Sequence, residues 1–185
     1  MRILIISGSP RGNSVTLRLA LHLKNAFSIA TDHEIDMVDL RNIEMPNLQT
    51  VFTSVDATPE KYKPVAAQMF SSDAFILITP EYNGSYSAPL KNLMDHFPKQ
   101  HHKTFGIVTA STGMLGGIRA ALQLQELVYA LFGIGSPYML VTPQVDKKFD
   151  AEGNLLDENF QKSIDIFIRE FTWLAERVVG EKVLP

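Results

Sequence analysis

One segment of the sequence collects the residue types that bind a phosphate group. Residues 7–16, SGSPRGNSVT, hold three serines, a threonine, two glycines and an arginine between an apolar run and a helical pattern. Hydroxyls and backbone N–H groups at a helix N-terminus meet the positive end of the helix dipole, which favours an anion. Gly8 and Gly12 let the backbone approach a ligand closely. Capping of the helix by Asn13 or Ser14 would explain only one hydroxyl, so the segment predicts a phosphate-binding loop.

Spacing excludes two common types of phosphate loop here. A Walker loop ends in Gly-Lys-Ser or Gly-Lys-Thr, and the segment contains no lysine. The dinucleotide pattern Gly-x-Gly-x-x-Gly does not fit Gly8 and Gly12, which are four positions apart. Asp39, which stands where a ribose-binding acid would be, is therefore interpreted as a helix cap or a turn residue. A loop this rich in hydroxyls suits a terminal monophosphate, such as that of flavin mononucleotide (FMN).

Two further segments have more polar and aromatic residues than a simple turn needs. PEYNGSYS, residues 80–87, offers tyrosines that can lie against a flat ring. Its Asn83 can anchor a turn, and Gly84 can adopt a positive φ. ASTGMLGGIRA, residues 110–120, is compact and rich in free N–H groups ahead of a helix. The residues that give it this character are Ser111, Thr112, Gly113, Gly116 and Gly117.

The pattern of apolar residues predicts the elements that position these segments. Short apolar runs without polar alternation indicate strands covered on both faces, as in a parallel sheet. Such runs occupy residues 3–6, 35–40, 74–79, 104–109 and 138–142. Helical patterns separate them, at residues 14–27, 60–70, 118–132 and 160–178, with another that starts at Pro89. The alternation predicts an α/β protein with a five-stranded parallel sheet and helices on both faces.

The strand order then brings the unusual segments together. In the doubly wound order 2-1-3-4-5, the first and third strands are neighbours, and the fourth strand follows the third. Each of the three segments follows one of these strands. The sequence therefore predicts one site at one edge of the sheet. The segment from Arg41 to Pro59 has no clear period and is interpreted as a long excursion after the second strand.

Composition narrows the class of protein. The formal charge is −3 and the pI is near 5.9, without any run of lysine or arginine, which argues against nucleic acid as a partner. There is no cysteine, so redox chemistry would need a bound cofactor. No apolar run approaches the roughly 18 residues of a membrane span, and the opening MRILIIS is shorter than a signal peptide. We expect a single domain over residues 1–185, located in the cytoplasm and without a membrane partner.

The sequence gives no indication of a catalytic side chain or a metal site. Glu81 and Asp95 fall in a loop and a helix that give their carboxylates no reason to converge. His96, His101 and His102 lie in HFPKQHHK, which is interpreted as a solvated helix end and turn. We expect no metal ion and no catalytic dyad.

The three segments together resemble the NAD(P)H-dependent FMN reductases, a flavodoxin-like family that includes quinone, azo-dye and chromate reductases. The resemblance rests on GSPRGNS, PEYNGSYSAPLKNLMD and the later G…GG.RA, and it extends from Met1 to about Phe132. It implies a flavodoxin-like three-layer α/β/α fold. It also implies that FMN places its phosphate in the first loop and its isoalloxazine ring against the second. The implied contacts are Ser9, Arg11, Ser14 and Thr16 for the phosphate, Pro80, Glu81, Tyr82, Asn83 and Gly84 for the ring, and Ser111 and Gly113 from the third loop.

The resemblance also implies an activity. NADPH or NADH would pass a hydride to FMN, and a flavin, quinone, azo compound or similar small acceptor would then take two electrons. Two alternatives stay open at this point: a one-electron carrier of the flavodoxin type, and a non-catalytic FMN-binding redox sensor. The chain departs from many relatives in one place, because Ser87, Ala88 and Pro89 follow Tyr86 where those relatives have Pro-Gly.

The predicted helix at residues 118–132 is apolar on two sides. One face carries Ala121, Leu124, Val128 and Phe132, and another carries Ile118, Leu122 and Tyr129. A helix of this kind needs a second apolar surface beyond its own sheet. Since the family commonly dimerises across its third and fourth helices, we expect a homodimer, with a tetramer left open.

Overall fold

The structure, a computed structural model, describes residues 1–180. Its central layer is a parallel sheet in which β2, β1, β3 and β4 lie side by side in that order, and both β5 and β6 pair with β4. The strand order 2-1-3-4-5 predicted from the sequence is therefore confirmed. The strands are β1 (Arg2–Ser7), β2 (Glu34–Asp39), β3 (Ala74–Thr79), β4 (Thr104–Ala110), β5 (Ile134–Gly135) and β6 (Leu140–Thr142).

The fifth position of the sheet differs from the prediction because two short strands share it. β5 pairs with Thr104 and Phe105, whereas β6 pairs with the segment from Val108 to Ala110. Pro137 lies between them and has no N–H group to donate to a sheet ladder. The predicted strand at residues 138–142 therefore corresponds to β6 alone, and β5 is an additional strand.

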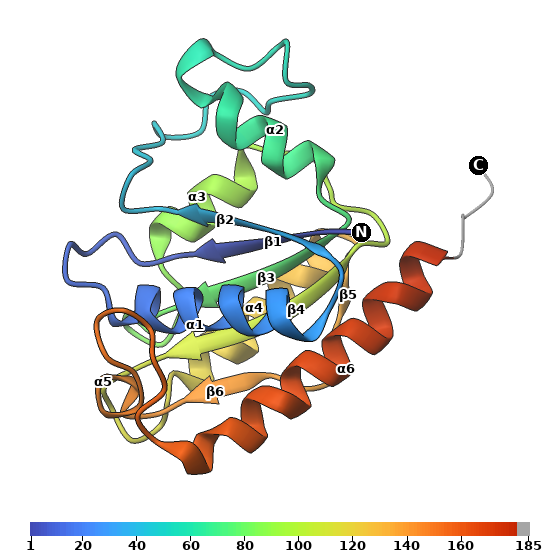
Figure 1. The fold of residues 1–185 in the computed structure, drawn as a ribbon. Coiled ribbons are helices and arrows are strands. Elements are labelled where there is room, and N and C mark those ends of the chain that lie inside the picture. The colour runs from blue at the N-terminus through green and yellow to red at the C-terminus, as the bar shows by residue number, and fades with distance from the viewer. Residues whose placement is uncertain (181–185) are drawn as a thin grey trace.

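Helices cover both faces of the sheet, as the sequence predicts (Figure 1). The helices α1 (Val15–Ala30) and α6 (Gln161–Gly180) pack on one face. On the other face lie α2 (Lys63–Ser71), α3 (Ala88–Asp95) and α4 (Ile118–Ala130). Three short helical segments complete the described elements: η1 (Glu60–Tyr62), α5 (Val145–Lys148) and η2 (Glu158–Phe160).

The apolar run of β1 shows why the strands have no polar face. Ile3 and Ile5 pack in the core beneath α1 and α6, whereas Leu4 and Ile6 pack beneath α2 and α3. All four side chains are fully buried. Because successive strand residues point to opposite faces, a sheet with helices on both sides needs apolar residues at every position.

The excursion at residues 41–59 has no helix or strand but is attached to α3. The N–H of Phe52 donates to the carbonyl of His96 at 2.7 Å, and the Asn92 side chain donates to the carbonyl of Pro46 at 2.8 Å. The Phe52 ring also lies 5.1 Å from the His96 ring. His96 is only 1% exposed, so the prediction that it sits at a solvated helix end is wrong. The physical reason is that Phe52 covers it.

The helix α4 agrees only in part with the predicted helix at residues 118–132. Ala121, Leu124 and Val128 share one face, as predicted, and are buried against the sheet. Phe132 lies beyond the end of the helix, with φ of 59°, and is exposed. Its placement on the same face as these three residues is therefore wrong, because a residue in the left-handed conformation does not continue the helical turn. Among residues 1–180, no helix is both long and apolar enough to cross a membrane.

Candidate functional site

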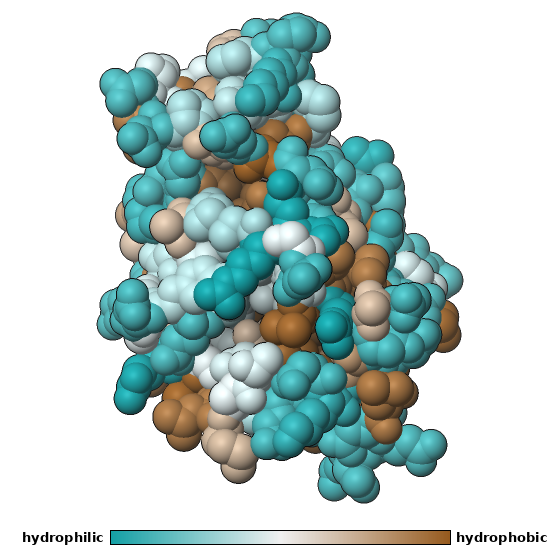
Figure 2. Space-filling view, turned by 90° about the vertical axis from the view of Figure 1, so that its left-hand side faces the viewer, coloured by the Kyte–Doolittle hydropathy of each residue, from teal (hydrophilic) through white to brown (hydrophobic). Residues whose placement is uncertain are grey.

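The three unusual segments meet at one edge of the sheet, as predicted. Ser7 at the end of β1 pairs with Ile78 of β3, and Thr79 of β3 pairs with Thr109 of β4. Parallel strands end at the same edge, so the connections that leave β1, β3 and β4 are neighbours. These connections are the phosphate loop (residues 8–14), the ring loop (residues 80–87) and the third loop (residues 111–117). Figure 1 shows this edge on the left, and Figure 2 views it from the front, with apolar surface exposed between polar side chains.

The phosphate loop ends in a capped helix N-terminus. Ser14 is the N-cap of α1, and its hydroxyl accepts a hydrogen bond from the N–H of Leu17 at 3.1 Å. This confirms one of the two capping residues that the sequence left open. Gly8 packs so closely on β3 that an added Cβ would lie 2.9 Å from the carbonyl oxygen of Ile78. Within residues 1–180, no acceptor is found for the N–H groups of Gly12 and Asn13. The loop therefore has free donors at the positive end of a helix.

The side chains predicted for the phosphate have different surroundings. Arg11 is exposed, whereas Ser9 is only 2% exposed and its hydroxyl accepts the N–H of Arg11 at 3.4 Å. Thr16 is fully buried in the first turn of α1, and its hydroxyl has no hydrogen-bond partner. A buried hydroxyl without a partner is costly, so it is a candidate for a bond to a ligand.

The ring loop is a tight two-residue hairpin turn. Tyr82 and Ser85 exchange backbone hydrogen bonds of 2.9 and 3.1 Å around Asn83 and Gly84. The φ angles of Asn83 and Gly84 are 52° and 85°, which is the type I′ geometry that Asn-Gly favours. The prediction that Asn83 anchors a turn and that Gly84 takes a positive φ is confirmed. Pro80 is buried where β3 ends, at the base of this hairpin.

Tyr82 connects the ring loop to the phosphate loop. The guanidinium carbon of Arg11 lies 4.8 Å from the centroid of the Tyr82 ring, within the range of a cation–π contact. The Tyr82 hydroxyl is buried and has no hydrogen-bond partner. The structure therefore brings these two predicted site residues together and leaves a phenol that a ligand could satisfy.

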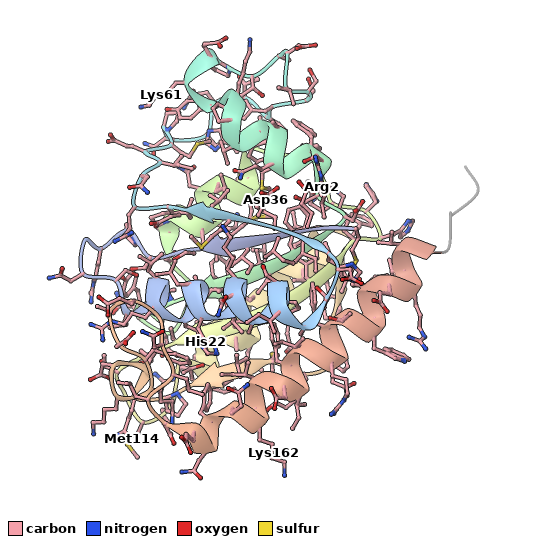
Figure 3. All side chains as sticks on the ribbon, in the orientation of Figure 1. Arg2, His22, Asp36, Lys61, Met114 and Lys162 are labelled. Atoms are coloured by element: carbon pink, nitrogen blue, oxygen red, sulfur yellow. The ribbon has the colours of Figure 1, made fainter. Side chains whose placement is uncertain are left out.

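The third loop is held by its own Ser111, by Thr109 of β4 and by Thr142 of β6. The Ser111 hydroxyl accepts the N–H of Gly113 at 3.1 Å, and the Ser111 N–H donates to the carbonyl of Thr142 at 3.1 Å. Thr109 donates to the carbonyl of Gly116 at 2.7 Å. Met114 is 76% exposed at the tip of the loop and points away from the body of the molecule (Figure 3). Ser111 and Gly113 thus lie at the predicted edge, and their hydrogen bonds join the third loop to itself and to residues 142–145.

Glu81 connects the ring loop to the third loop. Its carboxylate accepts the N–H of Arg119 in the first turn of α4 at 3.2 Å, and it lies 3.8 Å from the Arg119 guanidinium. Gly117, the N-cap of α4, has no side chain to accept that bond. Glu81 therefore caps α4 from another loop and compensates the positive end of its dipole. Helix capping therefore accounts for the position of the Glu81 carboxylate, which does not pair with Asp95. The Asp95 carboxylate instead forms an ion pair with Lys91 at 2.5 Å.

Two residues that sequence reasoning did not assign to the site hold the phosphate loop. The buried Ser87 hydroxyl donates to the carbonyl of Gly8 at 2.5 Å, and Arg41 donates to the carbonyl of Gly12 at 3.1 Å. The sequence contained a partial signal for Ser87, since a serine two positions before Pro89 is a common start for a helix. No signal identified the contact of Arg41. Asp39 accepts the Arg41 N–H at 3.1 Å, which confirms its interpretation as a turn residue.

The environment of Tyr86 keeps its phenol neutral. Burial raises the pKa of Tyr86 above its ordinary value, and the carboxylates of Asp95 and Glu126 raise it further. The ring packs against the core on the face of α3 and α4. The Tyr86 phenol therefore stays protonated at neutral pH, since its ionisation is disfavoured.

A cavity of about 690 Å³ lies beside the phosphate loop and α3. Its walls come from Pro10, from the start of the excursion and from the outer face of α3. Its volume is in the range of small-molecule sites. Arg41 and Lys91 are balanced by Glu44 and Asp95, so the lining has no excess charge. The remaining lining residues are Leu40, Ile43, Met45, Asn47, Ala88, Pro89 and Asn92.

An open parallel sheet with the phosphate loop after its first strand and the ring loop after its third strand is the arrangement of a flavodoxin-like nucleotide-binding protein. Comparison with protein families extends this assignment. Residues 1–143 match the model of the family described as NADPH-dependent FMN reductase. The chain is also 32% identical over 174 residues to the FMN-dependent NADPH-azoreductase of Staphylococcus aureus strain USA300, covering 91% of this chain and 92% of that protein. The chain therefore belongs to the NADPH-dependent FMN reductase family.

Solved structures share the fold. The NAD(P)H:(acceptor) oxidoreductase FerB of Paracoccus denitrificans superposes with a TM-score of 0.78 at 22% identity, over 95% of this chain and 97% of that one. The apo form of the NADH:FMN oxidoreductase EMOB gives a TM-score of 0.66 at 18% identity, over 92% and 89% of the two chains. A flavodoxin from the domain Archaea gives 0.61 at 12% identity, over 97% and 99%.

The family assignment makes the protein an FMN-dependent oxidoreductase with NADPH as electron donor. The residues present fit that cofactor. The free N–H groups at the start of α1 suit its phosphate, and the unpartnered hydroxyls of Thr16 and Tyr82 are buried polar atoms that lack a partner within the described chain. The bound flavin supplies the redox chemistry, taking a hydride from a nicotinamide and giving two electrons to an acceptor.

Proposed function

We propose that the phosphate loop and the ring loop form the FMN site of this reductase. Ser9, Arg11, Ser14 and Thr16 hold the phosphate. The ring loop, through Pro80, Glu81, Tyr82, Asn83 and Gly84, holds the isoalloxazine, with Ser111 and Gly113 beside it. The observation that carries the proposal is the contact between Arg11 and Tyr82, because it joins the anion-binding loop to the aromatic wall at a carbon-to-centroid distance of 4.8 Å.

In this site the protein positions the phosphate and the ring of the cofactor and supplies N–H dipoles, and it needs no catalytic pair of side chains to transfer protons. The N–H groups of the phosphate loop and the guanidinium of Arg11 bind the dianion. The type I′ turn presents backbone groups of Asn83 and Gly84 without bulky side chains at its tip. N–H dipoles fixed near the ring stabilise negative charge that develops on it.

Loading with FMN and anaerobic mixing with NADPH tests the activity. We expect the yellow absorbance to bleach rapidly and to return when an acceptor is added. Arg11→Gln should weaken FMN binding. Arg18→Gln, which removes a hydrogen bond from α1 to the Phe149 carbonyl, should not. A protein that binds FMN but is not bleached by NADPH, and that instead accumulates a stable one-electron-reduced form on illumination, would show a carrier and overturn the proposal.

We propose that the acceptors are small aromatic molecules such as quinones and azo compounds. Two observations support this class: the cavity of about 690 Å³ between the phosphate loop, the excursion and α3, and the similarity to an azoreductase. Apolar side chains such as Ile43 and Met45 suit a flat apolar ring, and the balanced charges of the lining favour a neutral acceptor over an anionic one.

Narrowing the cavity tests this assignment. Met45→Trp fills the space and should raise KM for a neutral azo dye, with little change in KM for NADPH. Leu48→Trp is the matched control, since Leu48 belongs to the same excursion, is 42% exposed and does not line the cavity. Equal KM values for the dye in Met45→Trp and the wild-type protein would place the acceptor elsewhere.

We propose that the protein is a homodimer formed through α4. Leu122, Tyr129 and Phe132 are 50%, 70% and 58% exposed on this side of the molecule, and a second copy would cover them. Sedimentation should show a species larger than the 20.7 kDa chain. Tyr129→Glu should dissociate it, and Ile29→Glu, at an exposed residue on α1, should not. A concentration-independent monomer would refute the dimer.

We further propose a single domain and a cytoplasmic location. Cores on both faces of one continuous sheet support the first, although residues 181–185 lie outside the described part of the chain. The lack of cysteine is compatible with a reducing compartment. Limited proteolysis, which should leave one resistant core, and cell fractionation test these two points.

A further inference from the structure

The phosphate loop is held in shape at Gly8 by a side chain from outside it. The Ser87 hydroxyl donates to the Gly8 carbonyl at 2.5 Å, while the Gly8 N–H donates to the Ile78 carbonyl at 2.7 Å. Ser87 is fully buried, and its own N–H donates to the Thr79 hydroxyl at 3.0 Å. Because a hydroxyl has a single proton, the Ser87 side chain commits its only donor to the phosphate loop.

A second side chain holds the other end of the loop. The guanidinium of Arg41 binds both carboxylate oxygens of Asp39, with nitrogen–oxygen distances from 2.6 to 3.1 Å. Its remaining terminal nitrogen donates to the Gly12 carbonyl at 3.1 Å. Asp39 is the last residue of β2, so Arg41 fixes the loop to the sheet. The pKa of Arg41 is raised above its ordinary value by the hydrogen bond to Asp39, and the guanidinium therefore stays charged.

These two bonds orient donors for an anion. The C=O and N–H of one trans peptide point in opposite directions. Fixing the carbonyl of Gly8 toward Ser87 turns the N–H of Ser9 away from Ser87. Fixing the carbonyl of Gly12 toward Arg41 likewise turns the N–H of Asn13 away from Arg41. An anion-binding loop requires N–H groups on its inner side and carbonyls outside it, which is the arrangement that the two contacts enforce.

We propose that Ser87 and Arg41 are positioning residues that set the phosphate loop and thereby determine the preference for FMN over riboflavin. The inference rests on the proposed function, since it takes the loop to bind the FMN phosphate. Riboflavin has the same ring system and lacks the phosphate, so it reports on the ring loop alone.

The test compares the dissociation constants of FMN and riboflavin for the apoprotein, measured by quenching of flavin fluorescence. Ser87→Ala and Arg41→Gln each remove one fixed carbonyl contact and should raise the constant for FMN by roughly tenfold, with riboflavin changed by less than about twofold. Arg41→Lys keeps the charge but loses the planar fork that binds the carboxylate and the carbonyl together, so it should behave like Arg41→Gln.

Matched controls come from the opposite end of the sheet. Arg2 pairs with Glu34 at the start of β2, at a distance of 2.7 Å, and lies far from the loops (Figure 3). Ser72 is 3% exposed and donates to the Gln68 carbonyl at 2.6 Å. Arg2→Gln and Ser72→Ala should leave both dissociation constants unchanged. Thermal unfolding of each apoprotein shows that it is folded, and Arg41→Gln provides the test if Ser87→Ala does not fold.

The outcomes separate the inference from the proposed function. A wild-type protein that binds riboflavin as tightly as FMN would overturn the phosphate site itself. If the wild type prefers FMN but the variants weaken both flavins equally, or weaken neither, the positioning role is wrong. Full recovery of FMN binding in Arg41→Lys would overturn the role assigned to the Arg41 fork, because charge alone would then suffice.

Discussion

Replacing Glu81 tests the link between the ring loop and the third loop. Glu81 is the side-chain acceptor at the N-terminus of α4, at 3.2 Å from the N–H of Arg119, and its side chain is 19% exposed. Loss of an N-terminal capping bond costs about 1 kcal/mol. Loss of a negative charge at the positive end of a helix costs a further ~0.3–1 kcal/mol. We therefore expect Glu81→Ala to reduce the free energy of unfolding of the apoprotein by roughly 1–2 kcal/mol.

Glu81→Gln separates the two contributions, since an amide oxygen still accepts the N–H of Arg119 but carries no charge. For a chain of this length 1 kcal/mol corresponds to about 2–4 °C, so Tm should fall by roughly 2–8 °C for Glu81→Ala and roughly 1–4 °C for Glu81→Gln. Scanning calorimetry measures Tm, and amide hydrogen exchange should increase in the first turn of α4. Glu126→Gln, in the same helix, is the control. A Glu81→Ala protein that unfolds within about 1 °C of the wild type would refute the capping role.

Three further changes probe other parts of the fold. Burial lowers the pKa of His22 below its ordinary value of 6.5, so the unfolded chain binds more protons below that pH. The contribution of neutral His22 to the free energy of unfolding is present above about pH 6.5 and is lost as pH falls through the lower pKa of the folded state. Urea unfolding should therefore show a smaller loss of stability between pH 7.5 and pH 5.5 in His22→Leu than in the wild-type protein. Equal losses in the two proteins would contradict the assignment. Gly84→Val places a β-branched residue at φ of 85°, which costs roughly 1–3 kcal/mol and should weaken riboflavin and FMN binding alike; unchanged binding would show that the turn adapts. Phe171 is fully buried, with its ring 5.6 Å from that of Phe27, so Phe171→Ala should cost about 3–5 kcal/mol in denaturant unfolding, and a loss below about 1 kcal/mol would mean that α6 does not depend on this contact.

The fold was predictable because its signals are local and repeated. The apolar run of β1 shows directly that both faces are covered, and the strand order then follows from general rules for open parallel sheets. The division of the fifth strand position was not predictable from the apolar run at residues 138–142, because β5 contains only Ile134 and Gly135. A two-residue strand has no period to detect.

The site was predictable at the level of loops and less so at the level of contacts. The Asn83-Gly84 pair predicts its turn from the sequence alone, since both residues tolerate a positive φ. Contacts between segments far apart in the sequence have no such signal. Arg41 and Gly12 are separated by 29 positions and Ser87 and Gly8 by 79, and only the folded sheet brings them together. The prediction that His96 is solvated is wrong for the same reason, because the residue that buries it, Phe52, lies in a segment without a regular pattern.

The contacts that hold the phosphate end of the proposed ligand site are stronger than the contacts that hold its ring end. Ser87 holds the phosphate loop through a fully buried hydrogen bond. The third loop is joined to the ring loop through Glu81, which accepts the N–H of Arg119 and lies beside the Arg119 guanidinium, whose side chain is 67% exposed. A fully buried hydrogen bond is costly to break, whereas a capping bond at a partly exposed junction competes with water and the ion pair beside it contributes little. The phosphate end is therefore preformed and the ring end is the more easily rearranged. An enzyme that must bind a nicotinamide and an acceptor in turn at the same ring benefits from this division, because the cofactor stays anchored while the surroundings of its ring adapt.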